Sequence, residues 1–101
     1  MKKKTARTKP AKRNMTFSYT VKPDAKEVFL VGDFNNWNQR TDRMVKRRGA
    51  FQKSKQLVPG EYQYKFLVDG EWYPDPAAER QIPNKYGTLN SVIRVEEAKN
   101  E

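Results

Sequence analysis

The sequence predicts an all-β protein, an antiparallel β-sandwich, and three observations carry this prediction. About six short segments have the composition and spacing of strands, turn-favouring residues separate them, and no segment has the periodicity of an amphipathic helix. The chain has 101 residues, which is enough for one small domain. We therefore expect a single sandwich without a large enclosed active site.

The first half of the chain contains three predicted strands. Residues 15–21 alternate between large apolar and hydroxyl-bearing side chains, which predicts a half-buried strand. Residues 27–31 are more uniformly apolar and residues 50–57 alternate weakly, and both segments predict further strands. Residues 33–43 are polar and show no period, so we expect a loop there that presents Trp37.

The second half has the clearest alternation in the protein. In residues 62–68 the aromatic side chains share one face, while Lys65 lies on the other and is expected to face solvent or a ligand. Asp69-Gly70 favours a tight hairpin turn. Residues 77–88 are expected to form a long loop, and the alternation of residues 89–95 predicts the last strand.

The positive charge is unevenly distributed along the chain. The formal net charge is +9, and residues 1–14 contain seven basic side chains and no acidic one. Because this segment has almost no large apolar residue, we expect a disordered basic tail over residues 1–14, a folded domain over 15–97 and a short tail over 98–101. The basic run at residues 46–48 is expected to lie in a solvated loop.

Several features bear on the cellular setting. No apolar segment follows the basic start, as it would in a secretory signal, and no run approaches the roughly 18 apolar residues of a membrane span. The chain has no cysteine, which excludes disulfides and thiol chemistry. We expect a cytoplasmic, monomeric protein that does not bind membranes.

Two tryptophans mark the candidate binding site. Trp37 and Trp72 each follow a turn and stand beside polar side chains. An indole can stack on the apolar C–H face of a pyranose, while neighbouring amides and charged groups bind the hydroxyls. The pattern indicates a saccharide-binding face. The alternative is that both tryptophans are core residues, since tryptophan is highly buried on average.

The motifs occur in the order seen in a known family. They are Gly32-Asp33-Phe34-Asn35-Asn36-Trp37, the run from Glu61 to Trp72, Asp75-Pro76, and Gly87-Thr88-Leu89-Asn90. Over residues 25–96 the chain resembles carbohydrate-binding module family 48, which includes the glycogen-binding domain of the β subunit of AMP-activated protein kinase. It is also similar to the N-terminal early-set domains of isoamylases and glycogen branching enzymes. The resemblance implies an immunoglobulin-like, early-set β-sandwich.

The same resemblance implies a non-catalytic site for α-glucan (glycogen, starch or maltooligosaccharide) that could target a partner enzyme or kinase to glycogen. The implied site residues are Trp37 and Trp72 for stacking, and Lys65, Thr88 and Asn90 for polar contacts. One position departs from the family. Tyr86 stands where the kinase-subunit members have a leucine, and it could add a wall to the site, so chain-length preference and affinity stay open.

The composition argues against catalysis. Without His and Cys, the usual zinc sites and the Ser-His or Cys-His arrangements are absent. Asp33, Asp69, Glu71 and Asp75 could supply a carboxyl pair for glycoside hydrolysis on composition alone, but each has a simpler role in a loop, a turn or a strand. In the related enzymes the catalytic residues lie in a separate (β/α)₈ barrel, for which this chain is too short. We expect no enzyme activity, no cofactor and no metal.

Two alternative functions stay open. The net charge and the aromatic residues could serve nucleic-acid or polyanion binding, although the charge is concentrated in the tail and not interleaved with the aromatics. The domain could instead dock a separate glucan-processing enzyme or kinase, with or without binding sugar. We expect no specific nucleic-acid binding.

Overall fold

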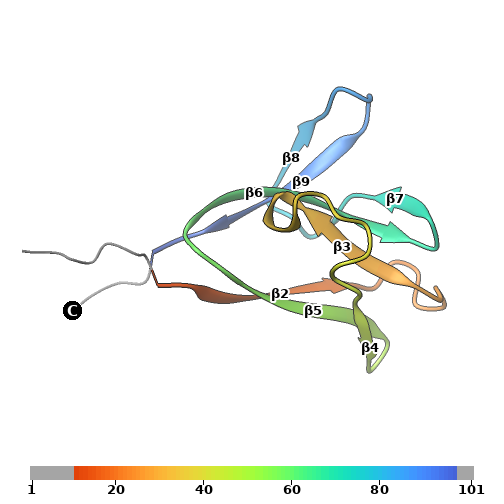
Figure 1. Ribbon diagram of the computed structural model, residues 1–101. Helices are drawn as coiled ribbons and strands as arrows, with labels where there is room; N and C mark the ends of the chain where they lie inside the picture. Colours follow the sequence, from red (N-terminus) through yellow and green to blue (C-terminus); the bar gives the residue numbers. More distant parts are fainter. Residues whose placement is uncertain (1–10, 98–101) are drawn as a thin grey trace, which may run out of the picture.

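The computed structural model describes residues 11–97. The predicted tail at residues 98–101, and residues 1–10 of the predicted basic tail, lie outside the described residues. The described part of the chain forms two antiparallel sheets and one short 3-10 helix, and contains no α-helix. Figure 1 shows the sheets as two layers that face each other. The predicted antiparallel β-sandwich is confirmed, while its immunoglobulin-like, early-set arrangement stays a prediction.

Each sheet combines strands from distant parts of the sequence. The first sheet has the order β2-β5-β4, with bounds Arg13–Tyr19, Ala50–Leu57 and Val45–Arg47. The second sheet has the order β3-β6-β9-β8, with bounds Val28–Gly32, Gly60–Val68, Leu89–Val95 and Arg80–Pro83. Strand β7, Glu71–Tyr73, pairs with the end of β6, and the 3-10 helix η1 spans Asp33–Asn35.

Aromatic pairs between β2 and β6 hold the two sheets together. The ring centroids of Phe17 and Tyr64 are 5.0 Å apart, and those of Tyr19 and Phe66 are 4.9 Å apart. All four residues are buried, because the alternation of each strand turns every second side chain toward the other sheet. Pairs of this kind contribute about 0.5–1.5 kcal/mol each beyond the burial of their surface.

The other face of β6 carries Lys65, one of the residues of the predicted binding site. Lys65 and Leu67 alternate with the core aromatics and therefore point away from the first sheet. Trp72 in β7 pairs with Leu67, and directly opposed residues of an antiparallel pair point to the same side, so Trp72 shares this outer face. The predicted hairpin turn is confirmed: Asp69 and Gly70 have φ of 47° and 84°, as a type I′ turn requires.

Strand β2 begins and ends two residues earlier than the alternation predicts. Tyr19 is its last residue and pairs with Phe51 near the start of β5, so the partner strand ends there. Val21, which the pattern placed on the side of Phe17 and Tyr19, follows the strand and is 55% exposed. The apolar alternation continues to Val21, but the pairing of β2 with β5 ends at Tyr19. The predicted bounds of this strand, residues 15–21, were therefore wrong.

Two short edge strands lie in segments that were expected to be loops. Strand β4 includes part of the basic run at residues 46–48, and β8 lies within residues 77–88. All residues of β4 are exposed, and β8 is at most half-buried. Hydrophobic alternation arises from burial of one face, so edge strands without a buried face leave no such pattern in the sequence.

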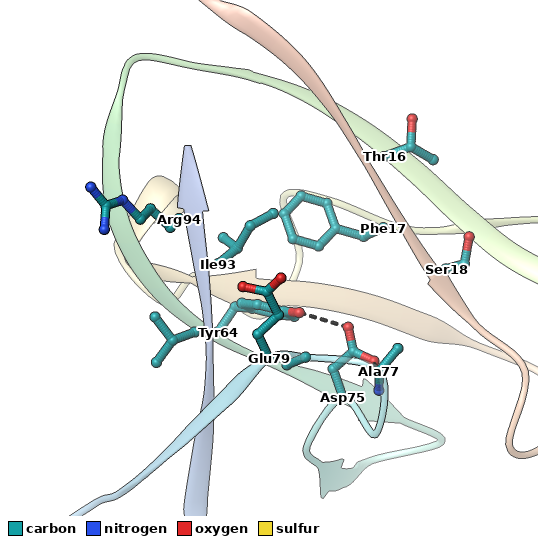
Figure 2. A pocket seen from close by; sticks show the side chains of 11 residues that line it. Thr16, Phe17, Ser18, Tyr64, Asp75, Ala77, Glu79, Ile93 and Arg94 are labelled. Atoms are coloured by element: carbon teal, nitrogen blue, oxygen red, sulfur yellow. Dashed lines mark hydrogen bonds between the residues drawn. The ribbon is translucent and has the colours of Figure 1, made fainter. Parts of the chain in front are cut away.

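A buried polar contact fastens the segment after β7 to the sheet. The Tyr64 hydroxyl donates to Asp75 Oδ2 at 2.6 Å (Figure 2). Asp75 N donates to Ser91 Oγ at 2.7 Å. The other carboxylate oxygen accepts the Ala77 amide at 2.9 Å. Burial, together with the bond to Asp75, raises the pKa of Tyr64 above its usual range. Because its pKa is raised, the Tyr64 hydroxyl stays protonated and donates to the buried Asp75 carboxylate.

Tyr64→Phe should lower the free energy of unfolding by about 1–3 kcal/mol, because it leaves the buried Asp75 carboxylate without one of its donors. Tyr62→Phe is the matched control, since the Tyr62 hydroxyl donates to the exposed Val58 carbonyl, and its cost should stay within about 0.5 kcal/mol. Urea denaturation measures both values. Equal losses in the two variants would contradict this role of Tyr64.

Candidate functional site

The outer face of the second sheet carries a groove of about 910 Å³. It is lined by residues of the loop after η1, of strands β6 and β7, and of the β8–β9 hairpin. The lining residues are Trp37, Lys65, Trp72, Pro74, Asn84, Lys85, Tyr86, Thr88, Leu89 and Asn90. All six site residues named from the sequence are among them, although they are spread over 54 positions of the chain, from Trp37 to Asn90.

Trp37 is fixed in place by hydrogen bonds from both of its nitrogen atoms. Its indole Nε1 donates to Asp33 Oδ1 at 2.9 Å, and its backbone N donates to Gly32 O at 2.8 Å. Asp33 Oδ2 in turn accepts the Gln63 amide at 2.7 Å, which ties the loop to β6. A Cβ on Gly32 would lie 2.6 Å from Gln63 O, so only glycine lets the loop approach β6 this closely.

A second set of hydrogen bonds, from the Asn35 side chain, holds the same loop. Asn35 Nδ2 donates to Leu30 O at 3.0 Å and to Asp42 Oδ2 at 2.7 Å. Asp42 is 4% exposed and forms an ion pair with Lys55 at 3.0 Å. These residues received no role from the sequence. Their contacts fold residues 33–43 into a fixed structure, so the indole of Trp37 needs little further ordering to receive a ligand.

Two further aromatic side chains border the groove. Trp72 is 41% exposed in β7, directly after the hairpin turn, and Tyr86 is 77% exposed between β8 and β9. Trp37 is half-buried. None of the three is a core residue. The alternative interpretation of the tryptophans as core residues is therefore wrong.

Lys65 lies at the floor of the groove. Its Nζ donates to Thr88 Oγ1 at 2.9 Å, and the residue is only 6% exposed. Lys65 thus faces the ligand groove, one of the two environments expected from the sequence, and it is shielded from solvent because the β8–β9 hairpin brings Thr88 onto it. This burial lowers the pKa of Lys65.

Asn84 is the centre of the hydrogen bonds that shape the hairpin. Its Nδ2 donates to Thr88 Oγ1 at 2.8 Å and to Asn90 Oδ1 at 2.9 Å. Its Oδ1 accepts the backbone amides of Tyr86 at 2.9 Å and of Thr88 at 3.1 Å. Asn84 was not predicted from the sequence as a site residue. The signal that could have identified it is the spacing of Asn84 and Gly87, because Asn at the first and Gly at the fourth position are typical of a β-turn.

These bonds also decide what the polar groups can offer a ligand. Thr88 Oγ1 accepts from both Lys65 and Asn84, so the proton of its hydroxyl is left as a donor. The Asn90 amide accepts from Asn84 and gives one N–H to Gln63 Oε1 at 3.0 Å, which leaves its second N–H. The groove thus presents neutral and charged donors between aromatic planes.

A second cavity, of about 360 Å³, lies between β2 and the segment after β7 (Figure 2). Its floor contains the bonded pair Tyr64 and Asp75, and none of the six predicted site residues lines it. The carboxylate of Asp75 is already occupied by donors. Within residues 11–97 no three His, Cys, Asp or Glu side chains lie close enough together to hold a metal ion. The outer groove is therefore the stronger candidate site.

Comparisons with known proteins identify the family of the chain. The family model described as "Glycogen recognition site of AMP-activated protein kinase" matches residues 13–101. The chain belongs to this family. Its members are carbohydrate-binding modules without catalytic activity, which confirms the resemblance stated from the motifs and the predicted non-enzymatic, glycogen-binding function class.

The individual relatives are longer than the segment that matches this chain. The 5'-AMP-activated protein kinase subunit beta-2 of Mus musculus is 41% identical over 73 residues, which are 72% of this chain and 26% of that protein. The subunit beta-1 of Sus scrofa is 43% identical over 70 residues, which are 69% of this chain and 55% of that sequence. This chain thus spans between about a quarter and about half of the length of these relatives.

The fold is shared more widely than the sequence. A maltogenic amylase from S. marinus matches 91% of this chain with a TM-score of 0.72, at 23% identity and over 15% of the amylase chain. At this identity the likeness concerns the fold alone. No helix within residues 11–97 has the length and apolar character needed to cross a membrane.

Asn84→Ala should loosen the hairpin, because the amides of Tyr86 and Thr88 lose their shared acceptor. Hydrogen exchange at these two amides should accelerate roughly 2- to 10-fold, as expected for the loss of one net hydrogen bond. Asn38→Ala is the matched control, since Asn38 Oδ1 accepts only the Arg40 amide in a different turn. Unchanged exchange at Tyr86 and Thr88 would show that Asn84 does not hold the hairpin.

Proposed function

We propose that the groove binds an α-glucan chain without catalysis, and that the six residues named from the sequence make the contacts. The single observation that supports the assignment is their arrangement. Three exposed or half-exposed aromatic side chains border one groove, and its floor presents Lys65, Thr88 and Asn90 between them. Aromatic planes with interleaved hydrogen-bond donors match the apolar faces and hydroxyl rims of successive glucose units.

The polar contacts follow from the hydrogen bonds already present. The hydroxyl of Thr88 and the free N–H of Asn90 act as donors to sugar oxygens, and Lys65 offers the protons that Thr88 does not take. Each contact replaces a hydrogen bond to water, so its net gain is small, about 0.5–1.5 kcal/mol. The affinity comes mainly from stacking and from the preformed site.

Tyr86 adds a third aromatic wall in this proposal. It is the most exposed of the three aromatics and stands at the tip of the hairpin, where the kinase-subunit members of the family have a leucine. A ring offers a flat surface to one more glucose unit. We propose that this position lengthens the segment of glucan in contact with the domain.

The groove has no means of hydrolysing the chain it binds. Hydrolysis usually needs two carboxyl groups on either side of the scissile bond. None of the residues lining the groove within the described chain is Asp or Glu. Asp33, one of the four acidic residues considered from the sequence, binds the indole of Trp37 and the Gln63 amide. This fits the non-catalytic character of the family.

The role of the whole protein is part of the same proposal. The relatives of which the chain spans a part are subunits of a kinase, which supports association of this protein with a kinase and its targeting to glycogen. We further propose that the sandwich, whose first strand begins at Arg13 and not at the predicted residue 15, lies between a basic tail and a short C-terminal tail. We also propose a monomer in the cytoplasm and no specific binding of nucleic acid.

Trp72→Ala should weaken binding of maltoheptaose by about 1–3 kcal/mol, by analogy with the stacking of bases on aromatic side chains, and should leave the fold intact. Trp37→Ala should have an effect of the same size. Titration of intrinsic fluorescence or calorimetry measures the affinity, and thermal unfolding checks the fold. Trp72→Phe is the matched control that keeps an aromatic plane and most of the affinity. A Trp72→Ala variant that binds as well as the parent would contradict the proposal.

Affinity for neutral maltoheptaose should change little between 50 and 200 mM salt, whereas binding through six to ten phosphate contacts would weaken roughly 10³- to 10⁵-fold. Removal of residues 1–10 should also leave this affinity unchanged. The deletion stops there because Arg13 belongs to β2 and donates to Glu96 O at 3.0 Å, so removing it would disturb the sandwich. A steep loss of maltoheptaose affinity on deleting the tail would place the tail within the site.

A further inference from the structure

The groove is positively charged without a compensating acid. Lys65 and Lys85 line it, and no Asp or Glu does so among the residues that the structure describes. The ion pairs found within residues 11–97 involve neither of these two lysines. Two cations therefore face a ligand site in which every other lining group is neutral.

The position of Lys65 makes this charge significant. The residue is 6% exposed, its Nζ lies in the groove, and the partner of Nζ among the described residues is the neutral Thr88 hydroxyl. Partial desolvation of an ammonium group that has no counter-charge is unfavourable, and this desolvation lowers the pKa of Lys65. Neutral sugar hydroxyls supply hydrogen-bond acceptors to such a group but no negative charge.

The second cation lies on the hairpin that covers the first. Lys85 precedes Tyr86, and its Nζ lies 5.4 Å from the centroid of the Tyr86 ring. Thr88 of the same hairpin accepts from Lys65. The turn that closes over Lys65 therefore also carries Lys85 to the aromatic wall of the groove.

We propose that the groove accepts α-glucan carrying a phosphate monoester, with the phosphate bound by Lys65 and Lys85. The inference rests on the proposed glucan-binding function and narrows its ligand. The aromatic side chains favour a ring with an apolar face, and two lysines without a counter-charge in the groove favour an anion on that ring. A monoester carries close to two negative charges at pH 7 and three acceptor oxygens.

The choice of cation favours phosphate over a sugar carboxylate. The planar fork of arginine matches a carboxylate in a bidentate manner, while lysine binds phosphate as a point charge. The groove contains two lysines and, in the described chain, no arginine. A nucleotide also combines a ring with a phosphate, and it is a separate outcome of the test below.

Calorimetry of the full chain should compare three probes at pH 7.5 and 50 mM salt. These are maltoheptaose, a maltoheptaose bearing one phosphate monoester, and AMP. The phosphorylated chain should bind about 5- to 10-fold more tightly than the neutral one, as expected for two partly screened ion contacts. This advantage should shrink at 200 mM salt, and also at pH 5, since the second pKa of the ester is about 6. AMP should bind more weakly than the phosphorylated chain.

Lys85→Gln tests the assignment within the groove, because it keeps the side-chain stem and removes one charge. The ratio of the affinity for the phosphorylated chain to the affinity for the neutral chain should fall toward 1. Lys26→Gln is the matched control: it removes one charge from an exposed position outside the groove and should leave the ratio unchanged.

The outcomes separate the two levels of the account. Equal affinity for neutral and phosphorylated chains, or an equal effect of Lys26→Gln and Lys85→Gln, would overturn the phosphate inference and leave the proposed glucan binding intact. Tighter binding of AMP than of either glucan would overturn it as well. Failure of both glucans to bind would overturn the phosphate inference and the proposed function together.

Discussion

Strand β6 is the element on which both the fold and the site depend. Its inner face supplies Tyr64 and Phe66, which pack against the aromatic residues of β2 and join the two sheets. Its outer face supplies Lys65 to the floor of the groove. It also pairs with β3, β9 and β7, so the segments that carry Trp37, Thr88 and Trp72 are all placed relative to it. A displacement of β6 by one residue would exchange core and groove.

Hydrogen bonds of polar side chains hold both loops that border the groove. Asp33 and Asn35 bind backbone groups on one side of the groove, and Asn84 binds both Thr88 and Asn90 on the other. The hydrogen bonds of Thr88 and Asn90 also leave one hydroxyl proton and one amide proton, respectively, without a partner among these residues. Because this ordering is complete before a ligand arrives, even weak hydroxyl contacts can yield net affinity. Lys65 and Lys85 differ from these polar groups, because no acidic side chain in the groove balances their charge. This charge is the feature that favours an anionic ligand.

The sequence predicted the parts of this structure that depend on neighbouring residues. The alternation of residues 62–68 gave the central strand, and the turn at Asp69-Gly70 placed Trp72 on an exposed face. The family motifs predicted six site residues, and all six line one groove. The burial of Lys65 was missed, because Thr88 covers it from 23 positions along the chain. The edge strands β4 and β8 were missed because neither buries a face that would impose a period.

The most direct test of the account is a titration of the isotopically labelled chain with maltoheptaose, followed by NMR. The account predicts that both indole N–H signals shift, as do the amide signals of Thr88 and Asn90, because all four lie on the groove. Signals of residues 77–79, which line the second cavity, should stay in place. Shifts confined to the second cavity or to the outer face of the β2-β5-β4 sheet, with both indole signals unmoved, would contradict the central claim.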